Sequence, residues 1–354
     1  MTKKKYTAID LFCGAGGLTL GLKKAGFKVI AGVEINQNAA KTYKKNHPRV
    51  KLYIEDIRKI SVSDVLRDLN LKPGDLDLLA GCPPCQGFSS QRTRNKTISI
   101  KDDRNNLIFD FLRFVELALP KTIMLENVPA LAKDWRVDVL RKKLALLGYK
   151  VDAQFAQVKD ASDYGVPQRR KRLLIKVSRM GSIPDPVSIE PKRTVRSAIA
   201  HLPIPGFSGD ELHDLAENRS DKVKKIISLV PKNGGSRSEI PMDFWLDCHK
   251  RNLGGYLDVY GRMSWDKVAP TITGGCHNPS KGRFIHPDQD RAITLREAAL
   301  LQTFPEKYKF LIKIGKDAIG LMIGNALPPE FIRQHAEQYF NHLKENSLES
   351  VAQI

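Results

Sequence analysis

Short apolar runs alternate with amphipathic segments through the first half of the chain. Apolar runs that stop at glycine or polar residues are typical of buried strands, and apolar positions at helical spacing are typical of helices. The strands predicted in this way are Thr7–Phe12, Val29–Glu34, Val50–Ile54, Leu76–Ala80, Thr122–Leu125 and Leu173–Val177. The predicted helices are Leu18–Ala25, Gln37–Lys45 after a capping Asn36, Leu107–Leu119 and Arg136–Leu147. The alternation predicts an α/β fold with a doubly wound, mostly parallel sheet.

The alternation stops near residues 183–192, where three prolines fall close together. The chain from there to about residue 290 is rich in Gly, Pro, Asn and Arg and has weak periodicity. Helical spacing returns at Ile293–Thr303 and again at Glu330–Lys344. We therefore predict a core domain of residues 1–193 and 315–354, interrupted near the C-terminus by a smaller, irregular domain of residues 194–314.

Charge and cysteine content narrow the class of protein. Lys and Arg number 58 against 39 Asp and Glu, a formal charge of +19, which favours a polyanionic partner. No apolar run approaches the roughly 20 residues that a membrane span needs. Five cysteines are an odd and sparse set, which indicates a reducing compartment rather than a disulfide framework. We expect a cytoplasmic protein with no membrane association.

A glycine-rich segment, Asp10–Gly17, joins the first predicted strand to a helix. Glycines there let a ligand approach the backbone closely at the carboxyl end of a strand. Thr19 occupies the position of the third glycine in the dinucleotide-binding fingerprint, whose glycines accommodate a pyrophosphate. Its presence there favours a cofactor without a pyrophosphate. Glu34 ends the next strand, where a carboxylate accepts hydrogen bonds from ribose hydroxyls, and Asp56 follows the third strand, within reach of an adenine amino group. A tight turn alone would explain the glycines, but the two carboxylates favour a nucleoside cofactor.

The segment Gly81–Ser89, GCPPCQGFS, follows a buried strand. Most free cysteines are small buried hydrophobes, but two prolines fix the loop and hold Cys85 at the carboxyl end of the strand. A thiolate there would be a nucleophile if neighbouring donors or positive charge favour it. A redox CxxC site is the alternative, and the glycine-rich loop with its acidic strand ends counts against it.

Two further motifs follow later strands. Glu126 and Asn127 come at the end of the strand that begins at Thr122, on the same predicted edge as Cys85. The basic run QRRKR leads into the strand Leu173–Val177, and strand alternation would place Arg170 and Arg172 on one face. A solvated basic face is the other interpretation of this run.

These motifs, in this order, resemble the conserved blocks of the cytosine-5 DNA methyltransferases of bacterial modification type. DLFCGAGG resembles the cofactor block, PPCQGFS the nucleophile block, ENV the glutamate block and QRRKR the arginine block. Arg291–Pro305 resembles the block that supports a recognition domain, and Ile323–Leu327 the last block. Cys82 departs from the small residue that the family often has, and we expect it to have no role.

The resemblance implies a reaction and a set of residues. Cys85 would add to carbon-6 of a flipped cytosine, Glu126 would protonate or hydrogen-bond N3, Arg170 and Arg172 would neutralise charge, and Asn127 would orient the loop or the base. The cofactor would be S-adenosylmethionine, giving S-adenosylhomocysteine, with no metal. The residues implied to line its pocket are Phe12, Gly14, Gly16, Glu34, Asp56, Ile57, Pro84, Leu107, Asn325 and Ala326.

Residues 194–314 would form the target recognition domain. Double-stranded DNA is the implied partner, and the residues expected to bind it are Ser89, Gln91, Arg237, Arg262 and Arg283. A cognate restriction endonuclease is a further expected partner, and we expect a monomer. The alternatives are methylation of transfer RNA, which the long recognition insertion disfavours, and a catalytically silent DNA binder. Cys-His pairs at 248–249 and 276–277 are weak evidence for zinc.

Overall fold

The computed structural model describes residues 5–84, 106–251 and 258–352. The chain divides into two compact units. Unit 1 comprises Met1–Tyr164, Lys171–Ser188 and Pro329–Ile354, and unit 2 comprises Gly165–Arg170 and Ile189–Pro328. These units are defined by internal contacts, and the assignment of residues 194–314 to target recognition stays a prediction.

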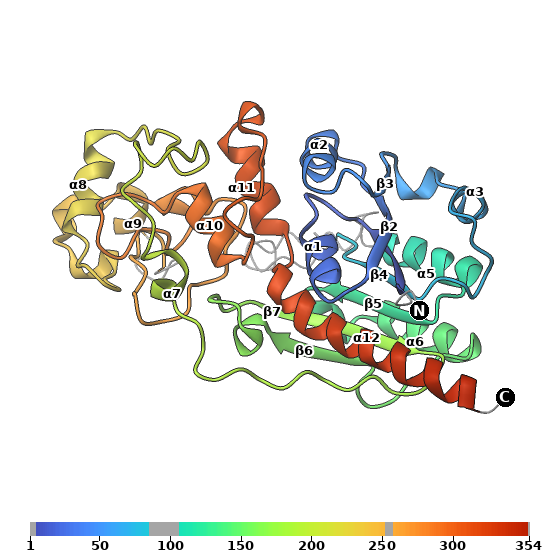
Figure 1. Cartoon of the computed structure of the whole chain (residues 1–354). Helices are drawn as coiled ribbons and strands as arrows, with labels where there is room; N and C mark the ends of the chain where they lie inside the picture. The colour runs from blue at the N-terminus through green and yellow to red at the C-terminus, as the bar shows by residue number, and fades with distance from the viewer. Residues whose placement is uncertain (1–4, 85–105, 252–257, 353–354) are drawn as a thin grey trace. The chain divides into compact units, whose positions relative to one another are not determined.

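A seven-stranded sheet in the order β3-β2-β1-β4-β5-β7-β6 forms the centre of unit 1 (Figure 1). Its strands are β1 (Thr7–Leu11), β2 (Lys28–Val33), β3 (Lys51–Tyr53), β4 (Leu78–Gly81), β5 (Thr122–Asn127), β6 (Ala156–Asp160) and β7 (Lys171–Ser178). The first five strands are parallel to one another, and β7 runs antiparallel to both β5 and β6. The predicted α/β fold with a mostly parallel sheet is confirmed.

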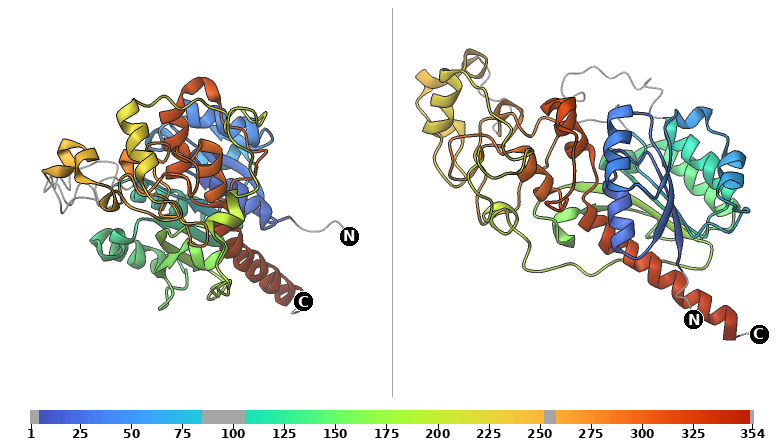
Figure 2. Two further views of the ribbon diagram at one scale, coloured as in Figure 1. Left: turned by 90° about the vertical axis from the view of Figure 1, so that its left-hand side faces the viewer. Right: turned by 45° about the horizontal axis from the view of Figure 1, so that its top comes forward.

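Helices cover both faces of this sheet, as the views in Figures 1 and 2 show. On one face, α3 (Val62–Asp68), α5 (Leu107–Ala118) and α6 (Trp135–Leu146) contribute to a core with Leu11, Leu79, Leu125 and other strand residues. On the other face, α1 (Gly17–Lys24) packs closely against α12 (Pro329–Ala352), and a Cβ at Gly21 would overlap Ile332. Burial of apolar surface on both faces is what this doubly wound arrangement requires.

Helix α2 (Gln37–Asn46) begins at the predicted cap, because the Asn36 side chain accepts hydrogen bonds from the backbone N–H groups of Asn38 and Ala39, each at 3.0 Å.

Unit 2 has longer connections between its helices. Its helices are α7 (Val195–Ile199), α8 (Asp221–Leu229), α9 (Asp247–Lys250), α10 (Leu295–Leu301) and α11 (Lys316–Asn325). Helix α10 starts with a capping box between Thr294 and Glu297. In the described part of the chain, no helix is long and apolar enough to cross a membrane.

Candidate active site

The polar residues singled out in the sequence gather at one edge of the sheet in unit 1. Because β1, β2, β3 and β4 are mutually parallel, their carboxyl ends meet at this edge. The segments that follow these four strands carry the predicted residues Phe12, Gly14, Gly16, Glu34, Asp56, Ile57 and Pro84. The structure therefore brings the predicted cofactor residues of unit 1 to one sheet edge.

The turn after β1 is held in left-handed backbone conformations and tied to the next strand. Gly14 and Gly16 have φ values of 54° and 97°, which glycine adopts at little cost, and Phe12 has a φ of 62°, which is uncommon for a residue with a side chain. The backbone N–H of Gly14 donates to Glu34 Oε2 at 2.8 Å, and that of Asn36 donates to Oε1 at 2.7 Å. A Cβ added to Gly14 would meet no atom of the described chain within 4 Å, so space remains beside this turn for a ligand.

Partial burial raises the pKa of Glu34 above its ordinary value, against the effect of these backbone donors. Each carboxylate oxygen has further lone pairs, so Glu34 can still accept hydrogen bonds from ribose hydroxyls. The role of Glu34 as a ribose acceptor stays a prediction.

Thr19 belongs to a buried polar chain beneath the glycine turn. Its hydroxyl lies 2.6 Å from Asp10 Oδ2 and 2.8 Å from the Tyr43 hydroxyl, and all three side chains are buried. This contact explains why threonine replaces the third glycine of a dinucleotide fingerprint. Asp10 Oδ1 is buried and has no hydrogen-bond partner among the described residues, and burial raises the pKa of Asp10 to about 7.

The raised pKa of Asp10 predicts that the free energy of unfolding depends on pH. The unfolded chain ionises this group near 3.8 and the folded chain near 7, so its contribution is complete below 3.8 and is lost as the pH rises to about 7. Between pH 5 and pH 8, we expect ionisation of Asp10 to lower the free energy of unfolding of the wild type by on the order of 2 kcal/mol. The free energy of unfolding of Asp10→Asn should fall by correspondingly less. Urea unfolding of both proteins at the two pH values checks this; equal losses would contradict it.

The remaining predicted residues of unit 1 border the same edge. Asp56 caps a short helical turn, Ile57–Lys59, and its carboxylate accepts from the Arg58 side chain, which lowers the pKa of Asp56. The carbonyl of Ile57 accepts from Arg113 of α5 at 2.6 Å. Leu107 is the first residue of α5 and packs against the core cluster. The Arg113 contact ties the turn after β3 to the middle of α5.

Glu126 and Arg172 form a largely buried ion pair at this edge. Arg172 Nε lies 2.8 Å from Glu126 Oε1, and the two side chains are 17% and 9% exposed. Asn127 donates from Nδ2 to the Pro83 carbonyl at 3.0 Å, so it fixes the backbone two residues before Cys85. Cys85 itself, with Ser89 and Gln91, lies outside the described residues.

Cys82 contacts the glutamate that the sequence predicts to be catalytic. Gly81 is in register with Leu125 on the parallel strand, so the next residues, Cys82 and Glu126, are neighbours. The thiol of Cys82 can therefore donate a hydrogen bond to the Glu126 carboxylate. Burial, followed by the charge of Glu126, raises the pKa of Cys82 well above its ordinary value and keeps it a thiol donor. The expectation that Cys82 has no role stays untested, and its place beside Glu126 is the reason to test it.

We predict a modest catalytic effect for the thiol of Cys82. Cys82→Ala removes one donor to Glu126 at nearly constant volume and should lower kcat about threefold, since one such hydrogen bond contributes about 1 kcal/mol or less. Cys82→Ser keeps a donor and should stay within about twofold of wild type. Steady-state rates at saturating substrates decide the point, and an alanine variant as fast as wild type would rule the role out.

Arg170 does not belong to the strand that contains Arg172, so the prediction that strand alternation places both on one face is wrong. Strand β7 begins at Lys171, so Arg170 precedes it and belongs to unit 2. Its side chain is buried and donates to the carbonyls of Ile272 and Gly324 at 3.0 and 2.9 Å. Asn325 and Ala326 are in unit 2 at the end of α11, where Asn325 is exposed.

The side chains of the arginines predicted to bind DNA mostly contact groups within unit 2. Arg262 is fully buried, and its three guanidinium nitrogens donate to the carbonyls of four residues and to Asp290. A guanidinium with these contacts cannot reach DNA, so the prediction for Arg262 does not agree with the structure. Arg283 donates to three carbonyls and to Asp258, and Arg237 is buried over the Trp245 ring. These residues organise unit 2.

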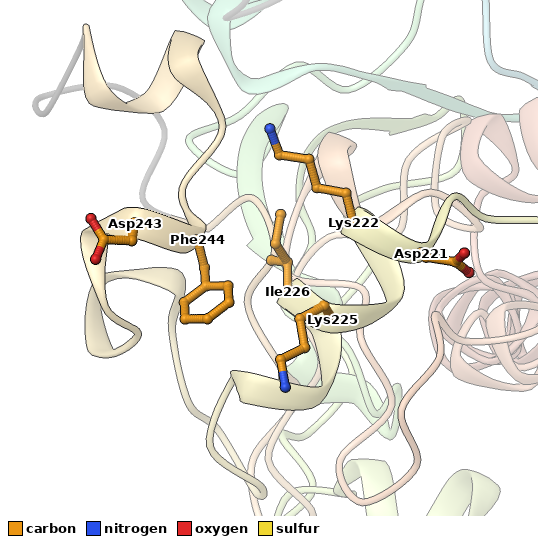
Figure 3. A pocket seen from close by; sticks show the side chains of 6 residues that line it. All are labelled: Asp221, Lys222, Lys225, Ile226, Asp243 and Phe244. Atoms are coloured by element: carbon orange, nitrogen blue, oxygen red, sulfur yellow. The ribbon is translucent and has the colours of Figure 1, made fainter.

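A shallow pocket of unit 2 lies between α8 and the turn Met242–Phe244 (Figure 3). Lys222, Lys225 and Ile226 of α8 face this turn, and Lys225 Nζ lies 5.9 Å from the centroid of the Phe244 ring. Two carboxylates, Asp221 and Asp243, also line the pocket. Its mixture of charges identifies no ligand.

The strand order, the glycine turn and the polar carboxyl edge of the sheet define a doubly wound α/β protein. Residues 6–341 match the family model described as C-5 cytosine-specific DNA methylase. The chain therefore belongs to the DNA cytosine-5 methyltransferases, and membership implies S-adenosylmethionine as the methyl donor.

Individual relatives agree with this assignment. The Type II methylase M.HgiDII of Herpetosiphon aurantiacus is 38% identical over 335 residues, which cover 90% of this chain and 91% of the relative. The Type II methyltransferase M1.HphI of Haemophilus parahaemolyticus is 36% identical, with 94% and 86% of the two chains covered. A solved structure described as a prophage-encoded DNA modification methyltransferase of Escherichia coli is 26% identical, with a TM-score of 0.70 over 96% of this chain and 100% of the other.

Proposed function

We propose that this methyltransferase modifies carbon-5 of a cytosine turned out of duplex DNA, through a covalent bond from Cys85 to carbon-6. The observation that carries the proposal is the Glu126–Arg172 ion pair at the sheet edge where the Cys85 loop begins. A buried carboxylate held by a guanidinium beside a cysteine loop is suited to acid catalysis and charge neutralisation on a pyrimidine.

The chemistry assigns one task to each group. The Cys85 thiolate adds to carbon-6, and the electron pair of the 5,6 double bond becomes available at carbon-5 as Glu126 protonates or hydrogen-bonds N3. Arg172 holds Glu126 Oε1 and neutralises charge near the cytosine O2. Loss of the carbon-5 proton after methylation restores the double bond and releases Cys85. Asn127 keeps the loop before Cys85 in place through the Pro83 carbonyl.

The residues of the sheet edge fit the cofactor that the family implies. When bound, S-adenosylmethionine supplies the methyl group from its sulfonium. The turn at Gly14 and Gly16 would receive its methionine part, Glu34 its ribose and Asp56 its adenine, with Phe12, Ile57, Pro84 and Leu107 around them. Asn325 and Ala326, which belong to unit 2, are proposed as further cofactor-binding residues.

The proposed partner is duplex DNA, read by the domain of residues 194–314, with Ser89 and Gln91 as further predicted DNA contacts. The buried Arg262 is withdrawn from the DNA contacts, and Arg170 from the catalytic groups. The relatives named as Type II enzymes support a role beside a cognate restriction endonuclease, and we propose that the enzyme acts as a monomer.

Methyl incorporation from labelled cofactor into duplex DNA and into transfer RNA, measured side by side, tests the proposal. We expect incorporation into DNA alone, and bisulfite sequencing of DNA from cells that express the chain should then show one short motif modified. Incorporation into transfer RNA alone would show that transfer RNA, and not DNA, is the substrate. DNA binding with no incorporation into either would leave a silent binder.

A further inference from the structure

Two buried glutamines and Arg170 form a continuous hydrogen-bonded network inside unit 2. Gln168, Arg170 and Gln302 are buried, at 0%, 3% and 0% exposure. They come from the arginine block and from the residue that follows α10, which are far apart in the sequence. Buried polar groups are costly unless they are hydrogen-bonded, so the partners of this network show what it holds.

The orientation of each amide group dictates that of the next. Gln168 Oε1 accepts from the backbone N–H of Ile272 at 2.8 Å, so its Nε2 donates to Gln302 Oε1 at 2.9 Å and to the Leu301 carbonyl at 3.3 Å. Gln302 Nε2 must then donate elsewhere, and it does so to the carbonyls of Ile323 and Ala326, at 2.6 and 3.3 Å. Both amides thus use both of their N–H groups.

The final partners of the network are the carbonyls at the end of α11. The last carbonyls of a helix have no partner within the helix, and here Gln302 binds that of Ile323 while Arg170 binds that of Gly324. A guanidinium is also favoured at the negative end of a helix dipole. Arg170 and Gln302 therefore cap the turn that presents Asn325 and Ala326.

The same groups hold this turn against the segment Ala269–Gly274. Arg170 donates to the Ile272 carbonyl, Gln168 accepts from the Ile272 N–H, and Thr271 Oγ1 donates to the Arg169 carbonyl at 2.7 Å. A Cβ at Gly324 would overlap the Thr273 and Gly274 backbone. Glycine is thus needed at this closest approach, and both backbone groups of Ile272 are fixed by side chains of the arginine block.

We infer that Gln168, Arg170 and Gln302 are positioning residues that hold the turn Ile323–Ala326, and with it Asn325, in the geometry needed for cofactor binding. The inference rests on the proposed function in one respect, the assignment of Asn325 to the cofactor pocket. It adds Gln168 and Gln302, to which the sequence assigned no role, and it gives Arg170 a role apart from the chemistry proposed for Arg172.

The test measures the affinity for S-adenosylhomocysteine by calorimetry, which needs no turnover. Arg170→Lys keeps the charge but cannot span two carbonyls, and Gln302→Met keeps the length of the side chain but removes both donors. Each should weaken binding about tenfold, the effect of roughly 1.4 kcal/mol. Arg169→Lys, the exposed neighbour in the same block, is the matched control and should bind like wild type.

The variant Asn325→Ala tests whether the network acts through Asn325 or whether its loss only disturbs the fold of unit 2. If the network acts through Asn325, Asn325→Ala should weaken S-adenosylhomocysteine binding by a similar factor. The double variant Gln302→Met/Asn325→Ala should then bind little more weakly than either single variant, because the two changes affect one interaction. Independent, multiplying losses would overturn the inference, as would unchanged affinity in Arg170→Lys and Gln302→Met. Thermal melting checks that the variants fold, and Arg170→Lys carries the test alone if Gln302→Met does not fold.

Failure of this inference differs from failure of the proposed function. A wild-type chain that binds S-adenosylhomocysteine but methylates neither DNA nor RNA would contradict the function, and the affinities of the variants would still be measurable. A wild-type chain that methylates DNA while the variants bind normally would contradict only the positioning role.

Discussion

Cys85→Ser is expected to abolish methyl transfer while leaving DNA binding intact. A serine hydroxyl in place of the thiol is a far weaker nucleophile near neutral pH, so the addition to carbon-6 should fail and kcat should drop by about 10⁴-fold or more. Binding involves phosphate and base contacts that the substitution leaves in place. Methyl incorporation and a gel-shift titration on the same duplex measure the two properties.

Cys248→Ser is the matched control for this variant, because Cys248 is an exposed free cysteine in unit 2. It should retain wild-type turnover. Normal methylation by Cys85→Ser would refute the nucleophile assignment, and loss of both turnover and DNA binding would point to a damaged fold instead.

Glu126→Gln is expected to lower kcat by about 10²- to 10³-fold, the range typical of a lost general acid. The amide keeps the size of the side chain but cannot supply a proton to N3, and it weakens the ion pair that Arg172 makes at 2.8 Å. The Michaelis constant for DNA should change little, because the missing interaction develops during the reaction. Steady-state kinetics on duplex DNA give both constants.

Glu116→Gln provides the comparison, since Glu116 is an exposed residue of α5, 3.8 Å from Lys143, on the same unit. It should behave as wild type. A Glu126→Gln variant with full turnover would remove this residue from the mechanism and leave Arg172 without its proposed purpose.

The sequence predicted the sheet well where strands are buried on both sides. Strands β1, β4 and β5 appear as short apolar runs, and their ends differ from the prediction by two residues or fewer. Strand β6 was missed because it lies at the sheet edge, is only partly buried and has the mixed sequence AQVKD. Helix α11 was missed because Gly320 and Gly324 argue against a helix, although close backbone contacts require glycine at both positions.

The candidate site was predictable where residues follow strand ends. Glu34 and Glu126 are such residues, since the carboxyl ends of parallel strands share one edge. The contacts of Cys82 and Arg170 were not predicted, because they join distant segments. Cys82 depends on the register of β4 on β5, and Arg170 donates to carbonyls about 100 residues or more away. The closeness of Cys82 to Glu126 could have been predicted, because Cys82 directly follows β4 and Glu126 lies near the carboxyl end of β5, the next strand along the chain.

The most direct measurement of the central claim uses a duplex in which the target cytosine carries fluorine at carbon-5. Addition of Cys85 and methylation can proceed, but carbon-5 has no proton to lose, so the thiol cannot leave. With S-adenosylmethionine present, we predict a DNA–protein adduct that survives denaturing electrophoresis and is absent for Cys85→Ser. Full methylation of ordinary duplex by the wild-type enzyme without any such adduct would contradict the covalent mechanism.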